Sequence, residues 1–225
     1  MHIVRTASSS DPGGTQSAQD TQHGRALTPA SNFLAVPAEP AYVPNMPSFA
    51  LMTADELLQT PQTDKRVDLV RGILRVREPA GYLHGEITAR LCKLLMDHVD
   101  ARELGRVLAA ETGFKLNADP DTVRAADIAF ISRARLPDPR PVGYPALAPD
   151  LAVEVLSPGD RPGELLAKVG DWLSAGTRLV WVVDPERRLA RVYRHDGSEA
   201  FVTAEGALDG EDVLPGFTCP LPSVL

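Results

Sequence analysis

Two acidic residues interrupt apolar runs, and a lysine follows on an amphipathic segment. Asp127 lies in Ala-Asp-Ile-Ala-Phe-Ile, Glu154 lies in Leu-Ala-Val-Glu-Val-Leu, and Lys168 comes on the segment after that. Both runs are typical of buried strands, where an ionised carboxylate is costly unless a positive charge meets it. Two carboxylates in contact repel by roughly 4 kcal/mol at intermediate polarity. Because hard cations such as Mg²⁺ bind one or two carboxylates and keep waters for chemistry, these residues indicate a cation site.

Each of the three residues also has a plainer interpretation. A strand acid can end in a salt bridge, and a helical lysine often covers an apolar face with its stem. Strand alternation turns Glu154 away from Val153 and Val155. The helix after this strand must return over it, which brings Lys168 towards Glu154. There the ammonium group could hold an attacking water or stabilise charge developing on a phosphate.

Two further polar residues are weaker candidates. Asp68, in Val-Asp-Leu-Val, either completes a metal site or pairs with Arg66 or Arg71. His84 stands where a long helix begins, so its imidazole either binds phosphate and relays protons or is a satisfied helix-start side chain. The sequence leaves both alternatives open.

Composition sets limits on the class of protein. The chain has 225 residues, 44% of them hydrophobic and 24% charged, which suits one domain and a tail. It shows no run long enough to cross a bilayer and no signal pattern, and its two cysteines suggest no disulfide framework, so we expect a cytoplasmic protein. The net charge of −7 argues against a broad basic surface for nucleic acid. The arginines near 133–140 and 187–194 are interpreted as solvated faces.

The domain organisation follows from periodicity and turn residues. Residues 1–48 are rich in Ser, Gly, Gln and Pro, and we expect a disordered tail. Residues 49–225 are expected to form one α/β domain, a mixed sheet flanked by helices. Its helices are predicted after the cap at Thr53, over His84–Leu104 with Leu94 on the apolar face, and up to Ala175 with Leu165, Leu166 and Trp172 facing inwards. Its strands are predicted within Arg66–Val76 and at Arg106–Ala110, Gly113–Leu116, Arg124–Ile131, Leu151–Leu156, Leu179–Val183, Leu189–Arg194 and Ala200–Thr203, followed by a proline-rich tail.

Several other chemistries find no support. The sequence has no phosphate-cradling glycine loop and no G-x-S-x-G nucleophile motif. His84 and His98 do not have the spacing of a zinc pair.

The chain resembles a known family in several segments. These are Asp68-Leu-Val-Arg-Gly, His84-Gly-Glu-Ile, Val123-Arg-Ala-Ala-Asp-Ile-Ala-Phe-Ile, Pro149-Asp-Leu-Ala-Val-Glu-Val-Leu-Ser-Pro, Lys168, Gly176-Thr-Arg-Leu-Val-Trp-Val-Val-Asp-Pro and Leu214-Pro-Gly-Phe. Together they resemble the bacterial putative restriction endonuclease family of the PD-(D/E)XK nuclease superfamily, from about Thr53 to the C-terminus. The resemblance implies a restriction-endonuclease-like fold and hydrolysis of DNA phosphodiester bonds with Mg²⁺ or Mn²⁺.

The resemblance also implies roles for particular residues. Asp127 takes the place of the PD aspartate, Glu154 that of the next acid, and Lys168 that of a lysine relocated to the following helix. The Val155 carbonyl would be an additional metal ligand. Asp68 and His84 would support the site from the opposite wall as further catalytic residues.

Three positions depart from the pattern, and rival functions remain. Ala126 replaces proline, Leu156 stands where the superfamily lysine would be, and Asp68 replaces the usual glutamate. A module that keeps the nuclease fold without turnover is the main alternative, and hydrolysis of another phosphoester is a third. Cutting both DNA strands would favour a two-fold homodimer.

Overall fold

The computed structural model describes residues 51–60 and 65–225, and within them eight strands form one mixed sheet. The predicted tail, residues 1–48, lies outside the described residues. The apolar strand β5 (Leu151–Val155) is central and buried throughout, as its sequence predicts. The strands are β1 (Arg66–Val70), β2 (Ile73–Arg77), β3 (Gly105–Asn117), β4 (Thr122–Ser132), β5, β6 (Leu179–Asp184), β7 (Leu189–Arg194) and β8 (Glu199–Val202).

The strand order is β2-β1-β4-β5-β6-β7-β8, with β3 paired to β4 beside this path. Among the described strands of this sheet, β5 and β6 run parallel and the other pairs are antiparallel. The parallel pair requires a crossover, and helix α3 (Pro162–Ser174) supplies it. The sheet therefore has the mixed character that the sequence predicts.

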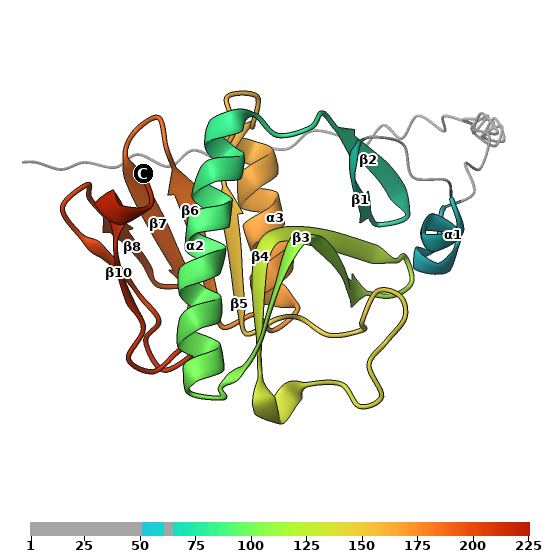
Figure 1. The fold of residues 1–225 in the computed structure, drawn as a ribbon. Coiled ribbons are helices and arrows are strands. Elements are labelled where there is room, and N and C mark those ends of the chain that lie inside the picture. Colours follow the sequence, from blue (N-terminus) through green and yellow to red (C-terminus); the bar gives the residue numbers. More distant parts are fainter. Residues whose placement is uncertain (1–50, 61–64) are drawn as a thin grey trace, which may run out of the picture. The chain divides into compact units, whose positions relative to one another are not determined.

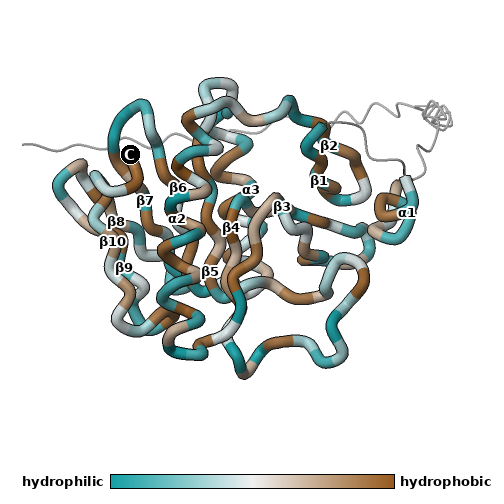
Figure 2. The backbone as a smooth tube through the Cα atoms, in the orientation of Figure 1, coloured by the Kyte–Doolittle hydropathy of each residue, from teal (hydrophilic) through white to brown (hydrophobic). Residues whose placement is uncertain are grey.

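Helices cover both faces of the sheet (Figure 1). Helix α2 (Tyr82–Ala101) packs on the face that carries Val153 and Trp181, while α3 packs on the face that carries Ala152 and Val180. Since side chains alternate along β5, Glu154 faces α3. Hydrophobic residues concentrate along the sheet strands and on the inner stripes of the helices in Figure 2. The order of the strands thus places Glu154 beneath the crossover helix.

The predicted inner faces of the two helices need correction at one residue each. Leu94 on α2 and Leu166 on α3 are exposed, although both were expected to face the core. Each lies next to a better-placed partner, Leu95 or Leu165, and the sheet surface accommodates only one of the two neighbours. Helix α2 also begins two residues earlier than predicted, at Tyr82, and ends at Ala101.

The two strands predicted at Arg106–Ala110 and Gly113–Leu116 are one strand, β3. Its pairing with β4 shifts between Ala109 and Thr112, where Ala110 and Glu111 have φ of 55° and 58°. This β-bulge interrupts the alternation, which is why the sequence looks like two strands. The bulge turns Glu111 towards the end of the sheet where Asp127 lies.

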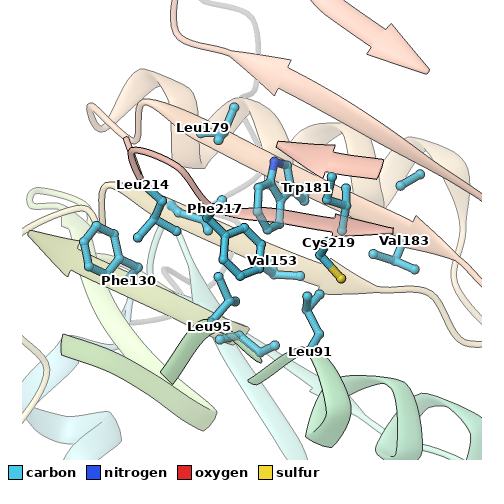
Figure 3. Close-up of a cluster of buried hydrophobic side chains, with 14 of the residues drawn as sticks. Leu91, Leu95, Phe130, Val153, Leu179, Trp181, Val183, Leu214, Phe217 and Cys219 are labelled. Atoms are coloured by element: carbon cyan, nitrogen blue, oxygen red, sulfur yellow. The ribbon is translucent and has the colours of Figure 1, made fainter. Parts of the chain in front are cut away.

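The C-terminal segment, predicted from the sequence only as a proline-rich tail, contains two further short strands. Strands β9 (Ala207–Asp209) and β10 (Thr218–Pro220) form a two-stranded antiparallel sheet. Leu214, Phe217 and Cys219 enter the core beside Trp181 on the α2 face (Figure 3). Each of these strands is three residues long, too short to show periodicity.

The remaining elements are short. They are α1 (Ala54–Gln59), η1 (Arg133–Arg135) and η2 (Leu221–Ser223). Thr53 and Glu56 form a reciprocal capping box at the start of α1, as the cap at Thr53 predicts. Among the described residues, none of the helices combines the length and the apolar character that a bilayer crossing requires.

The packing of Phe217 predicts that the C-terminal segment stabilises the whole domain. Its ring stacks on Trp181 with 5.9 Å between centroids. We expect Phe217→Ala to lower the free energy of unfolding by about 3 kcal/mol, because a buried aromatic is replaced by a cavity. Phe201→Ala is the matched control, since Phe201 is 59% exposed, and it should lose less than about 1 kcal/mol. Equal effects of the two variants in urea unfolding would contradict this placement.

Candidate functional site

The acidic residues and the lysine predicted as a site converge at the C-terminal end of β5. Asp127 comes from β4, Glu154 and Val155 from β5, and Lys168 from α3. They line one enclosed cavity of about 10 Å³, together with Arg66 of β1. This volume holds about one water molecule. The structure thus brings together residues from four elements that are distant in the sequence.

Glu154 and Lys168 form a buried ion pair. Lys168 Nζ donates to Glu154 Oε2 at 2.7 Å, and Trp172 Nε1 donates to Oε1 at 2.9 Å. Glu154 and Lys168 are only 4% and 3% exposed. Lys168 and Trp172 are one helical turn apart, so both reach the same carboxylate from α3. Lys168 is therefore a buried charge partner rather than a lysine that covers an apolar face.

Two hydrogen-bond donors from other elements hold Asp127, and a histidine from a third element lies beside it. Arg66 Nη2 donates to its Oδ1 at 2.7 Å, and the Val155 backbone N–H donates to its Oδ2 at 2.7 Å. His84 Nε2 lies 3.1 Å from the same Oδ2, within ion-pair distance but without the alignment of a hydrogen bond. The His84 side chain at the start of α2 is thus directed at Asp127.

The pKa values of Glu154 and Asp127 are shifted in opposite directions because the surroundings of the two carboxylates differ. Burial raises the pKa of Glu154 to about 7, since the attraction of Lys168 is opposed by repulsion from Asp127. Burial also works to raise the pKa of Asp127, but His84, Lys168 and the Val155 N–H together hold that pKa below its usual value. Burial alone would lower the pKa of Lys168, and the charges of Glu154, Asp68 and Asp127 raise it. The lysine therefore stays charged while Glu154 can exchange a proton near neutral pH.

Asp68 lies in a second, adjoining network. Its Oδ2 accepts from Arg124 Nη1 at 3.1 Å and its Oδ1 accepts from the Ala125 N–H at 3.0 Å. Arg124 also donates to Asp171 of α3 at 2.6 Å. Burial works to raise the pKa of Asp68, while the charges of Lys168 and Arg124 hold it below its usual value. Asp68 pairs with Arg124, not with the Arg66 or Arg71 considered from the sequence, and its part in a reaction stays a prediction.

Sequence reasoning missed two residues that contact this site. Arg66 was considered only as a partner of Asp68, and Glu111 was not among the candidates, yet the two form an ion pair with each other. Arg66 could have been noticed because it lies opposite Arg77 in a short hairpin. Glu111 could not, because the β-bulge breaks the alternation of side chains at its position. Burial raises the pKa of Glu111 despite the charge of Arg66.

A larger groove reaches Asp127 from the other side. It has a volume of about 510 Å³ and runs between α2 and the bulged part of β3. His84, Glu111 and Asp127 stand among its lining residues, and most of the remaining lining is small or apolar. Asp127 therefore borders both the enclosed cavity and the open groove.

The arginines near 133–140 and 187–194 lie towards solvent, and several of them form ion pairs. Arg135 pairs with Asp150, Arg187 with Asp184 and Arg194 with Glu211. Asp150 is itself buried, and it also accepts from the Ser132 N–H at 2.8 Å.

The carboxylate oxygens of this site are chemically suited to a hard divalent cation, but the acidic side chains around it are few. Within residues 51–60 and 65–225, no group of three or more His, Cys, Asp or Glu side chains is arranged to hold a metal ion. Mg²⁺ needs only one or two carboxylates with waters, which Asp127 and Glu154 can supply. All four of their oxygens already accept from N–H donors of the chain, so an ion would have to replace at least one donor.

Comparisons with known proteins identify the family of the chain and its fold. The family model Uma2, described as "Putative restriction endonuclease", matches residues 54–222. A solved structure of a putative nuclease belonging to DUF820, from Anabaena variabilis ATCC 29413, is similar to the chain with a TM-score of 0.66 at 21% identity. The match covers 77% of this chain and 97% of that one, and at this identity it shows the fold. No curated protein matches the chain.

The Asp68 network predicts a stability difference between two similar variants. Asp68→Asn keeps the shape but removes the charge that faces buried Arg124, and we expect unfolding in urea to become easier by about 2 to 3 kcal/mol. Asp171→Asn removes the other partner of Arg124, but its side chain is 20% exposed, against 5% for Asp68, so about 1 kcal/mol is expected. A larger loss of unfolding free energy for Asp171→Asn than for Asp68→Asn would contradict Asp68 as the more important partner of Arg124.

Proposed function

Since the chain belongs to the putative restriction endonuclease family, we propose that it is an endonuclease that hydrolyses DNA phosphodiester bonds with a divalent cation. The family and the fold support a nuclease role. The single observation that carries the proposal is the convergence of Asp127, Glu154 and Lys168 on one buried cavity at the end of β5. Two carboxylates beside a buried lysine ammonium group are suited to phosphoryl chemistry.

Asp127 and Glu154 would hold Mg²⁺ or Mn²⁺, with the Val155 carbonyl as a further oxygen ligand. The bound ion would supply a polarised phosphoryl oxygen and a more acidic water. Lys168, fixed by Glu154 at 2.7 Å, keeps its positive charge where the phosphate would gain negative charge. His84, at 3.1 Å from Asp127, holds a ring nitrogen where a proton can be passed to or from the groove. Asp68 supports Lys168 by its charge.

A module that keeps the nuclease fold without turnover is the second candidate. The observation that favours it is the full occupation of the carboxylate oxygens of Asp127 and Glu154 by donors of the chain itself. Arg66 and Lys168 neutralise the two acids without a metal. Under this candidate the ion pairs are structural, and neither metal nor DNA would displace them.

A plasmid-nicking assay with Mg²⁺ tests the catalytic assignment. The wild-type protein should convert supercoiled plasmid to the nicked form, and Glu154→Ala with Lys168→Ala should lower the rate about 100-fold or more, because a ligand and a charge stabiliser are both lost. Equal cleavage by the wild type and this double variant would refute the assignment.

The control for that assay keeps the same charge balance. Arg133→Ala with Glu103→Ala removes one base and one acid from an exposed pair with 3.5 Å between charged atoms. This variant should cut at the wild-type rate. We also propose that a protein that cuts both DNA strands acts as a two-fold dimer. In that case the nicked plasmid should be converted further to the linear form.

The raised pKa of Glu154 predicts that metal binding depends on pH. A proton must leave Glu154 before an ion can bind it, and its pKa is about 7. Affinity for Mn²⁺ in calorimetric titration should therefore rise about tenfold between roughly pH 6 and pH 8. Glu154→Gln carries no such proton, so its weaker binding should not rise in this way. A pH-independent affinity in the wild type would contradict Glu154 as a metal ligand, and no Mn²⁺ binding at either pH would favour the module without turnover.

A further inference from the structure

The β1–β2 hairpin places two arginines directly opposite each other. Arg66 and Arg77 are register partners in this antiparallel pair, so both side chains project from the same face of the hairpin. Like charges at facing positions destabilise a sheet. Both arginines nevertheless line the cavity that contains Asp127, Glu154 and Lys168. Because the Arg66–Arg77 pair costs stability and lines the cavity, a role in function would explain its presence.

Each arginine is neutralised by carboxylates from outside the hairpin. Arg66 pairs with Asp127 and with Glu111 of the β3 bulge. Arg77 reaches Asp160, in the loop between β5 and α3, at the longer distance of 3.5 Å. Asp160 in turn accepts from the Ser157 N–H at 2.8 Å. The Arg77–Asp160 contact thus links the hairpin to the loop that follows Glu154.

The cavity is nearly filled in this arrangement. At about 10 Å³ it has no room for a phosphate group, although arginines are half-buried at its edge. The hairpin connects to the start of α2 at the same end of the sheet as the β5–α3 loop (Figure 1). For a phosphate to enter, Arg66 must leave Asp127 and Glu111, and Arg77 must leave Asp160.

We propose that Arg66 and Arg77 form a clamp for a backbone phosphate of the nucleic acid, and that Glu111 and Asp160 hold the clamp closed until that phosphate arrives. This rests on the proposed nuclease function. The planar guanidinium binds a phosphate through two parallel hydrogen bonds, a geometry that a lysine does not offer. A phosphate held by both arginines would stand beside Asp127, Glu154 and Lys168.

The outer part of the hairpin can extend the same contact. Arg71 and Arg75 are exposed, and their guanidinium groups make no ion pair or hydrogen bond with the described residues. Arg75 is two residues from Arg77 on the same face of β2. This local basic stripe accounts for how a chain of net charge −7 could meet a polyanion. The contact area is one hairpin rather than a broad surface.

Fluorescence anisotropy of a short labelled DNA duplex in EDTA tests the clamp without cleavage. We expect Arg77→Gln and Arg66→Gln each to weaken binding about tenfold at low salt and to reduce the slope of log affinity against log salt by about 1, as for one lost phosphate contact. Arg140→Gln is the charge-matched control, because Arg140 is exposed on the loop that leads into the other end of β5. Circular dichroism and thermal unfolding check that the variants are folded.

Asp160→Asn separates a phosphate clamp from a structural ion pair. If Arg77 serves only to tie the hairpin to the β5–α3 loop, Asp160→Asn and Arg77→Gln should weaken duplex binding alike. If Arg77 binds phosphate, Asp160→Asn releases it and the duplex should bind as tightly as to the wild type or more tightly. Arg77→Lys should keep the salt slope but not the full affinity.

The outcomes distinguish the clamp from the nuclease proposal. A wild type that nicks plasmid while the Arg66 and Arg77 variants bind and cut like Arg140→Gln overturns the clamp and leaves the nuclease standing. A wild type that binds the duplex through these arginines but never nicks it overturns the nuclease and leaves the phosphate contact standing. A wild type that does not bind the duplex at any salt concentration overturns the clamp.

Discussion

The structure depends on the mutual neutralisation of charges that are buried together at one end of the sheet. Asp127, Glu154 and Lys168 are each less than 5% exposed, and a buried charge without a partner costs several kcal/mol. Strands β1, β4 and β5 and helix α3 must all be in place before these charges can pair. Replacing such a network by apolar residues often leaves stability unchanged or improves it. The network is therefore weak evidence for stability, and its presence sets a constraint on how the strands and α3 must assemble.

The same pairing sets the condition for any reaction at this site. Arg66 covers one oxygen of Asp127, and Lys168 covers one oxygen of Glu154. A cation and a phosphate together carry both signs of charge, so they can replace these partners without leaving a charge unpaired. Without the other, a cation would face Arg66 and a phosphate would face the two acids, so each is expected to bind more weakly alone. Metal and nucleic acid are thus expected to favour each other's binding.

The sequence predicted the elements whose signals are local and missed what depends on geometry. The apolar runs around Asp127 and Glu154 were sufficient to locate β4 and β5, and the pattern within Arg66–Val76 located β1 and β2. The bulge at Ala110 and the three-residue strands β9 and β10 have no periodicity to detect. Arg66 could not be assigned to Asp127, because its partner is set by which strands become neighbours. The family and the fold agree with the prediction, while the roles of the site residues stay predictions.

The place of the lysine follows from the path of the chain. Residues 154 and 156 would project from the same face of a continuing strand, but β5 ends at Val155 and position 156 is leucine. Helix α3 then returns across that face, and its Lys168 reaches Glu154 at 2.7 Å. Trp172 of the same helix donates to the other oxygen of Glu154, so α3 fixes this carboxylate at two points. The buried carboxylate of Glu154 is therefore met by a cation from the crossover helix rather than from the strand that carries the acid.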